Sequence, residues 1–246
     1  MVISILYLFL LVIFLIIYGI FISVVWLLTV WWDKKKRAIA AATYVHAMML
    51  FWLAPGWKIK VEGARNYDKR KPYVMICNHQ GMFDIPLIYA IHPNTRWVAK
   101  RELLKMPFVG HALLIHGDIL IRRGEATSAR HMLKKAKAEL DKGVSVTIFP
   151  EGTRLKSGKM NKFREGAFLL AKMAGVDILP VVLDGTANAT DGWKLRHPHT
   201  FRLKVLPPIP AETVKNTGVK ELMDGAREMI LAAHMEMRPD LYPNEK

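Results

Sequence analysis

The first 32 residues of the chain contain no charged side chain. As a single helix this stretch would be about 48 Å long, which exceeds the roughly 30 Å hydrocarbon core of a bilayer. It is too long for the core of a signal peptide and has no basic region before it, so we expect it to be retained. Trp26, Trp31 and Trp32 near its end are side chains typical of a membrane interface. The sequence therefore predicts an N-terminal membrane anchor.

A basic cluster at positions 34–37 follows directly and is expected on the cytoplasmic side, where Lys and Arg are enriched. A second stretch without charge covers residues 38–57 and is interrupted by Pro55 and Gly56. Two full spans would place the cluster opposite the basic remainder of the chain, against that rule. We therefore expect one span, or a deeply embedded first helix, followed by a helix in the cytoplasmic interface. The alternative is a helical hairpin that never crosses the membrane.

From residue 58 the pattern changes to short apolar strands that alternate with amphipathic helices. This alternation predicts an α/β domain over residues 58–246, with a central sheet flanked by helices, behind the anchor over residues 1–57. The expected strands are 57–61, 74–77, 97–99, 119–121, 144–149, 178–183 and 201–206, and the clearest helices are 127–140, 163–173 and 219–237.

The formal net charge of the chain is +15, and every Lys and Arg lies after position 33. Such an excess favours an anionic partner: a phospholipid surface, a nucleic acid, or an acidic carrier or substrate. Cys77 is the only cysteine, which excludes an internal disulfide and fits a reducing compartment.

The segment 78–84, Asn-His-Gln-Gly-Met-Phe-Asp, lies between an expected buried strand and an expected helix start. Pro86 suits the first turn of that helix, and Asp84 suits its N-cap. A carboxylate at this spacing can accept a hydrogen bond from one nitrogen of His79, and the other nitrogen is then free to remove a proton from a hydroxyl. The alternative for any single His-x4-Asp spacing is a turn histidine bonded to the backbone.

A second candidate segment is 149–154, Phe-Pro-Glu-Gly-Thr-Arg, at the end of an expected strand, where α/β proteins bind ligands. Gly152 allows a ligand to approach the backbone, and the guanidinium of Arg154 matches phosphate oxygens. Glu151 could orient that guanidinium or accept from a ligand hydroxyl. The alternative is a tight turn with a local Glu–Arg pair.

Two further cations follow other expected strands. Lys100 could hold a phosphate as a point charge, and Arg123 is the more plausible anion ligand of segment 117–124, with Arg122 at the surface. A solvated basic face explains such residues equally well.

Four blocks in one order, 78–84, 100–110 with 117–123, 149–154 and 178–182, resemble the glycerolipid acyltransferase family. The resemblance is strongest to its bacterial 1-acyl-sn-glycerol-3-phosphate acyltransferases and covers about residues 57–210. An N-terminal hydrophobic anchor is also common in that family.

The resemblance implies a mixed central sheet and transfer of a fatty acyl chain from acyl-CoA or acyl carrier protein to the free sn-2 hydroxyl of 1-acyl-sn-glycerol-3-phosphate. The product would be phosphatidic acid. It implies no cofactor beyond the thioester co-substrate, no metal and no nucleic acid partner. It also places the enzyme at the bacterial inner membrane, with the catalytic domain on the cytoplasmic face and against anionic lipid.

The resemblance further implies that His79 is the general base and Asp84 its partner. The family often has Asp before the arginine that Arg123 matches, whereas this chain has Arg122 there, so the electrostatics of that block depart from the pattern. The implied substrate-binding residues are Lys100, Arg123, Glu151, Gly152, Thr153 and Arg154.

Several alternatives stay open from the sequence. The acceptor could be another lysophospholipid or glycerol-3-phosphate, or the chain could be a membrane-tethered basic lipid-binding module without chemistry. An esterase would require a Gly-x-Ser-x-Gly elbow, which this sequence lacks. Cys77, two residues before His79, raises a covalent Cys/His mechanism that we do not favour. The histidines lack the carboxylate spacing typical of zinc sites.

Overall fold

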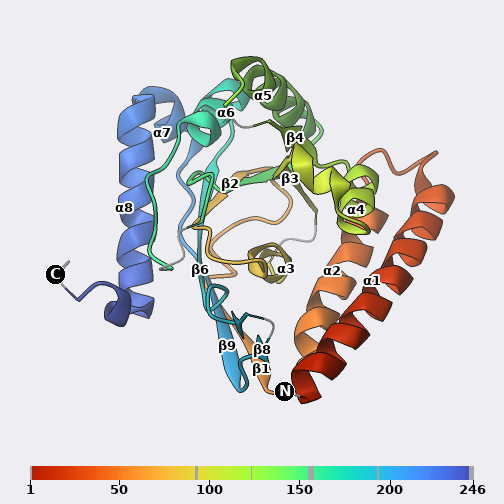
Figure 1. The fold of residues 1–246 in the computed structure, drawn as a ribbon. Coiled ribbons are helices and arrows are strands. Elements are labelled where there is room, and N and C mark those ends of the chain that lie inside the picture. The colour runs from red at the N-terminus through yellow and green to blue at the C-terminus, as the bar shows by residue number, and fades with distance from the viewer. Residues whose placement is uncertain (1, 92–93, 123, 155–157, 193, 244–246) are drawn as a thin grey trace.

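The computed structural model describes residues 2–91, 94–122, 124–154, 158–192 and 194–243. Its first two elements are the long helix α1 (Val2–Thr29) and the shorter helix α2 (Arg37–Leu53). They lie side by side and antiparallel along one flank of the α/β domain (Figure 1). Within α1, residues Ile5–Thr29 are long and apolar enough to cross a membrane, and little of that stretch is buried by the rest of the protein.

The predicted strands and helices are confirmed, most of them within two residues, and the helix predicted from residue 163 begins at Gly166. The sequence did not predict helices α4 (Val109–His116) and α7 (Ala211–Asn216), or the short hairpin of β7 (Thr190–Asp191) and β8 (Lys194–Leu195). The remaining elements are β1 Trp57–Glu62, β2 Val74–Cys77, α3 Asp84–Ile88, β3 Thr95–Lys100, η1 Arg101–Lys105, α4 Val109–His116, β4 Ile119–Ile121, α5 Ala126–Asp141, β5 Ser145–Ile148, α6 Gly166–Ala174, β6 Ile178–Asp184, β7 Thr190–Asp191, β8 Lys194–Leu195, β9 His199–Val205, α7 Ala211–Asn216, α8 Val219–Met237 and η2 Pro239–Leu241.

The central sheet has the strand order β1-β9-β6-β2-β5-β3-β4. Strands β6, β2, β5, β3 and β4 are parallel, whereas β9 runs antiparallel to β6 and pairs in parallel with β1. The sheet is therefore mixed, as expected. Because the carboxyl ends of parallel strands meet at one edge, the turns after β2, β5, β3 and β6 face the same side of the molecule.

Both faces of the central strands β2, β5 and β6 are buried. Alternate residues of β2 point to opposite faces, so Val74 and Ile76 join the core beneath α5, α6 and α8, whereas Met75 and Cys77 join the core beneath α2 and α3. A strand buried on both sides reads as a continuous apolar run, which is why β2 could be predicted.

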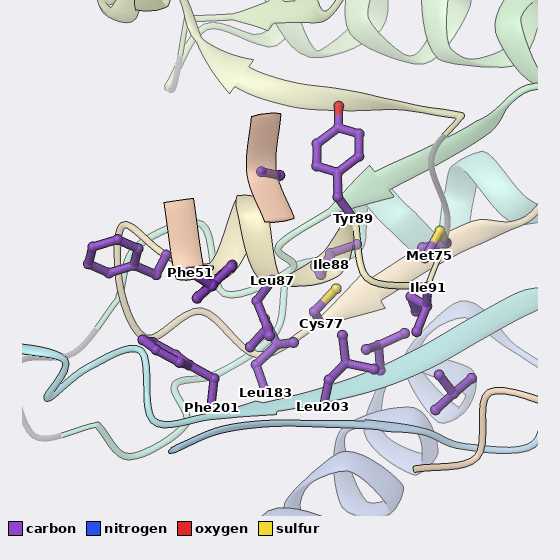
Figure 2. Close-up of a cluster of buried hydrophobic side chains, with 14 of the residues drawn as sticks. Phe51, Met75, Cys77, Leu87, Ile88, Tyr89, Ile91, Leu183, Phe201 and Leu203 are labelled. Atoms are coloured by element: carbon purple, nitrogen blue, oxygen red, sulfur yellow. The ribbon is translucent and has the colours of Figure 1, made fainter. Parts of the chain in front are cut away.

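Helix α2 belongs to that second core, so the expectation of a separate helix in the membrane interface is incomplete. Its Phe51 is buried, and its ring centroid lies 4.8 Å from that of Phe201 on β9; Figure 2 shows both near Leu87 of α3. The division at residues 57 and 58 stays a prediction, and the two parts share a core. An apolar helix can be stabilised by contact with protein or with lipid. The sequence therefore could not distinguish a helix in the protein core from a helix in the membrane interface.

The turn between α1 and α2 is fixed to the α/β domain by two cations. The ammonium group of Lys36 donates to the carbonyl oxygen of Ile115 at the end of α4, at 2.7 Å. The buried guanidinium of Arg96 donates to the carbonyl oxygen of Lys35 at 2.7 Å and lies 3.5 Å from Glu139. The basic cluster at positions 34–37 therefore has a structural role in addition to its expected electrostatic one.

Candidate active site

The turn that carries His79 begins with Asn78, whose side chain is buried at the end of β2. The Asn78 amide group donates to the carbonyl oxygen of Leu183 and accepts from its N–H group, both at 2.8 Å. The amide thus extends the pairing of β2 with β6 by one step beyond the last strand residue. This pairing fixes the point at which the chain leaves the sheet, directly before His79.

His79 and Asp84 are in direct contact, since Nδ1 of His79 lies 2.6 Å from Oδ2 of Asp84. The N-cap position of α3 is occupied by Phe83, and not by Asp84 as expected, so Asp84 is the first residue of the helix. Its carboxylate turns back over the preceding loop, where it serves the imidazole and the loop backbone together. The carboxylate is fully buried, whereas about a fifth of the imidazole surface is exposed.

Asp84 accepts three more hydrogen bonds from the surrounding backbone and side chains. Its Oδ2 atom accepts from the N–H groups of Gln80 at 2.7 Å and Gly81 at 2.9 Å. Its Oδ1 atom accepts from the hydroxyl of Thr186, just beyond β6. A buried carboxylate needs such partners, and here they also fix its orientation.

The contact with Asp84 sets the tautomer of the His79 imidazole. A carboxylate accepts only, so Nδ1 of His79 carries the proton and Nε2 keeps a lone pair. The ring also stacks on Phe149 at the end of β5, with a centroid separation of 4.3 Å and an angle of 20° between the planes. Stacking on Phe149 fixes the plane of the imidazole, and the contact with Asp84 fixes its Nδ1 edge. Nε2 is then able to accept a proton.

Glu151 lies beneath this turn, and its carboxylate is almost fully buried. One oxygen accepts from the backbone N–H group of His79 at 2.8 Å, and the other accepts from that of Asn161 at 2.7 Å. Burial raises the pKa of Glu151 from 4.5 to about 7, against the opposing effect of these two hydrogen bonds. In this structure Glu151 joins two backbone segments, and its expected contact with substrate stays a prediction.

The rest of segment 149–154 is more open. Gly152 has a φ of 71°, and a Cβ atom there would lie 3.0 Å from Nε of Arg164, so the position suits glycine. Thr153 and Arg154 are exposed. The backbone N–H group of Arg164 donates to the carbonyl oxygen of Pro150 at 2.9 Å, which brings an additional exposed cation to this turn.

The other predicted cations lie at or beyond strand ends. Lys100 is the last residue of β3 and is exposed at the same edge of the sheet as His79. Arg122 is at the surface, as expected, and its guanidinium lies 3.7 Å from the carboxylate of Glu125. Arg123 lies outside the described residues. The structure thus brings the His79 side chain into contact with Asp84 and the His79 backbone into contact with Glu151. Lys100 and Arg154 are exposed after the neighbouring strands β3 and β5.

Three residues of the site were not assigned from the sequence. Gln80 and Thr186 support Asp84, and Phe149 stacks on the imidazole. Phe149 stood within a candidate segment, but its partner could not be read from spacing alone. Thr186 lies about a hundred residues from Asp84 and carries no local signal.

Cys77 is fully buried in the core beneath α2 and α3 (Figure 2). Burial raises the pKa of its thiol, which disfavours the thiolate form that a nucleophile needs. Both observations oppose the covalent mechanism. Among the described residues, no three His, Cys, Asp or Glu side chains could together hold a metal ion.

Comparison with known proteins places this site in a family. A family model described as Acyltransferase matches residues 58–184. The chain is 32% identical over 214 residues to 1-acyl-sn-glycerol-3-phosphate acyltransferase alpha of Mus musculus, covering 85% of this chain and 73% of that protein. It is 43% identical over 167 residues to the 1-acyl-sn-glycerol-3-phosphate acyltransferase of Helicobacter pylori, covering 67% and 70%.

A solved structure is similar over almost the whole chain. The crystal structure of the 1-acyl-sn-glycerophosphate acyltransferase PlsC from Thermotoga maritima superposes with a TM-score of 0.80 at 25% identity, covering 96% of this chain and 95% of that one. The agreement includes the N-terminal helices, which the family model does not cover. By sequence and by structure, the chain belongs to the acyltransferase family.

Proposed function

We propose that this chain transfers an acyl group from a thioester to the sn-2 hydroxyl of 1-acyl-sn-glycerol-3-phosphate, giving phosphatidic acid. The observation that carries the chemistry is the 2.6 Å contact between His79 and Asp84, which leaves Nε2 of a partly exposed imidazole able to accept a proton. The names of the relatives support the choice of acceptor.

The reaction needs a base and no protein nucleophile, because a thioester carbonyl is already activated. Nε2 of His79 takes the proton of the acceptor hydroxyl as its oxygen attacks the thioester carbonyl carbon. The new C–O bond forms, the C–S bond breaks, and the departing sulfur takes the proton from the imidazolium. The enzyme returns to its starting state, with an ester and a free thiol as products.

Asp84 stabilises the positive charge that the imidazole acquires during this reaction. A buried carboxylate 2.6 Å from Nδ1 favours the imidazolium, and its fixed orientation keeps Nε2 directed away from the core. A positioned base of this kind contributes about 10² to 10⁴-fold to the rate. Positioning of the two substrates and stabilisation of the oxyanion supply the remainder.

The acceptor carries a phosphate monoester, and the exposed cations at this edge of the sheet suit it. Arg154 offers a planar pair of donors for phosphate oxygens, and Lys100 offers a compact positive charge. Arg123 remains part of the proposed set. Gly152 and Thr153 would let the ligand approach the backbone at the same turn.

The acceptor and the product both reside in a membrane, and helix α1 suits an enzyme that works there. The apolar segment Ile5–Thr29 would anchor the chain in the bacterial inner membrane. The cations of positions 34–37 favour the cytoplasmic side and attract anionic lipid. Acyl-CoA and acyl carrier protein are both suitable donors, since both present a thioester on a phosphate-bearing arm.

The test is acyl transfer by the detergent-purified full chain. Labelled acyl-CoA and acyl carrier protein are each combined with 1-acyl-sn-glycerol-3-phosphate, other lysophospholipids and glycerol-3-phosphate, and the His79→Ala variant serves as control. We expect His79-dependent formation of phosphatidic acid. Preferential acylation of another acceptor would show that 1-acyl-sn-glycerol-3-phosphate is not the preferred substrate. Lipid binding without any transfer would overturn the enzymatic proposal.

A further inference from the structure

The side chain of Gln80, the residue after the catalytic imidazole, is held by the C-terminal helix. Nε2 of Gln80 lies 2.9 Å from Nε2 of His234 on α8, although 154 positions separate the two residues in the sequence. The same amide nitrogen lies 3.3 Å from the carbonyl oxygen of Gly158. Gln80 and His234 are both buried, so these contacts are shielded from water.

The contacts determine the form of His234. An amide NH₂ group only donates, and its two protons suit the Gly158 carbonyl and one imidazole nitrogen. Nε2 of His234 must therefore accept, which requires a neutral ring with its proton on Nδ1. That nitrogen lies 2.9 Å from the hydroxyl of buried Tyr242, which can accept the proton. Burial lowers the pKa of His234, in agreement with a neutral ring.

Gln80 connects this arrangement to the catalytic pair through its backbone. Its N–H group donates at 2.7 Å to Oδ2 of Asp84, the same atom that lies 2.6 Å from Nδ1 of His79. A displacement of Gln80 would therefore alter the orientation of the carboxylate and the imidazole together. Displacements of about 1 Å at such a pair can reduce turnover by as much as about 100-fold.

We infer that His234 is a positioning residue of the proposed reaction, acting through Gln80. It accepts a hydrogen bond from the Gln80 side chain and so keeps the Gln80 N–H group on Asp84. The inference rests on the proposed function for its effect on turnover, and on contacts of the structure alone for its effect on the turn 79–84. The C-terminal helix is thereby part of the catalytic support.

The closing experiment compares variants that differ in the ability to accept a hydrogen bond. His234→Leu removes the acceptor, whereas His234→Gln retains one in its amide oxygen. Ile230→Ala is the matched control, because Ile230 is fully buried one turn earlier on α8 and packs in the core beneath the sheet. It lowers stability without touching Gln80.

We expect His234→Leu to lower kcat by about 10- to 100-fold with the KM for the acceptor changed by less than about twofold, since only positioning is lost. His234→Gln should recover most of kcat, and Ile230→Ala should lower the melting temperature but not kcat. Gln80→Ala should match His234→Leu, and the double variant should be no worse, because both changes break one connection. The inference would be overturned if kcat of His234→Leu were unchanged or if only KM changed. It would also be overturned if the double variant lost the product of the two single losses in kcat.

Hydrogen–deuterium exchange of the 79–84 amides separates this inference from the proposed function. His234→Leu should accelerate exchange there, and Ile230→Ala should not do so selectively. If the wild type transfers no acyl group but exchange responds in this way, the proposed function fails and the positioning contact stands. If the wild type is active and neither exchange nor kcat responds, the positioning inference fails alone.

Discussion

At the scale of single residues, Asp84 determines the geometry of the site. Its two oxygens accept from the imidazole of His79, two backbone N–H groups and the hydroxyl of Thr186. A carboxylate with these partners has one orientation available, and the imidazole follows it. The spacing His-x4-Asp therefore works because the intervening loop returns to the same carboxylate.

Gly81 in that loop lies against the backbone of Thr186, and we predict that Gly81→Ala impairs the enzyme. A Cβ atom there would lie 2.2 Å from the carbonyl oxygen of Thr186, so the backbone must shift. Overpacking of this kind costs about 1–3 kcal/mol, and here it would also displace an N–H group from Asp84. Thermal unfolding and kcat measure the two effects.

The control for this substitution is Gly225→Ala on α8, where an added Cβ meets open space. Helical glycine costs roughly 0.5–1 kcal/mol relative to alanine, so this variant should be neutral or slightly more stable. Equal behaviour of the two variants in stability and turnover would contradict the close approach at Gly81.

Glu151 predicts a pH dependence of stability. Its pKa is raised from 4.5 in the unfolded chain to about 7 in the fold, so the folded state binds the proton more tightly. The stability contributed by this group is therefore complete below pH 4.5 and is lost as the pH rises through about 7. The limit is about 1.4 kcal/mol per pH unit, or on the order of 3 kcal/mol over this window.

Unfolding of the wild type and of Glu151→Gln, followed between pH 4.5 and 8, isolates this contribution because other titrating groups are common to both. The wild type should lose stability relative to the variant as the pH rises. A difference that stays constant over the range would show that Glu151 ionises in the fold as it does in water.

At the scale of elements, the helix hairpin of α1 and α2 combines a segment apolar enough to cross a membrane with a part of the protein core. Helix α2 buries Phe51 against Phe201, whereas most of α1 is left uncovered by protein. The turn that joins the helices is attached through Lys36 and Arg96. Because of these contacts, the active-site edge and the expected membrane segment are expected to move as one body.

We predict that Lys36→Met weakens this attachment. The half-buried ammonium group donates to the carbonyl oxygen of Ile115, and hydrogen bonds to charged groups contribute about 1.5–3 kcal/mol. The variant should unfold at a lower temperature but retain vesicle binding, because the apolar segment proposed to enter the membrane, Ile5–Thr29, is unchanged. Lys34→Met removes an exposed cation of the same cluster and is the control. An equal loss in both variants would show that only the net charge matters.

The elements show what the sequence could predict. Strands β2, β5 and β6 were readable because they are buried on both faces and remain apolar throughout. Helix α4 and the β7–β8 hairpin were not predicted, since they are short and lack a clear period. The packing of α2 depends on long-range contacts that composition does not encode.

The residues of the candidate site also fall into those that the sequence could predict and those that it could not. His79, Asp84 and the 149–154 turn could be predicted because each follows a readable strand at a recognisable spacing. Thr186, His234 and the backbone role of Glu151 could not, because their partners lie 72 to 154 positions away. Sequence spacing therefore predicted the contact between His79 and Asp84, and the structure shows the distant residues that hold this pair.

At the scale of the whole molecule, one edge of the sheet carries the His79–Asp84 pair and exposed cations, and an apolar helix hairpin lies nearby. The net charge of +15 attracts anionic lipid generally, but only cations at this edge can place a phosphate beside His79. The arrangement suits a substrate with an apolar chain and a charged headgroup.

Arg154→Ala tests whether the headgroup is bound there. Loss of a charged hydrogen bond should raise the KM for 1-acyl-sn-glycerol-3-phosphate by about 10- to 100-fold with a smaller change in kcat. Arg70→Ala is the control, because Arg70 is highly exposed in the connection that precedes β2. If both variants raise KM equally, overall charge and not a phosphate site explains the effect.

The proposed reaction requires that the imidazole of His79 remove the proton of the acceptor hydroxyl. The most direct measurement is kcat of the folded His79→Ala variant in detergent, with acceptor binding measured in parallel. We predict a fall in kcat of at least about 10² to 10⁴-fold with binding of 1-acyl-sn-glycerol-3-phosphate retained. Turnover at the wild-type rate in this variant would exclude His79 as the base.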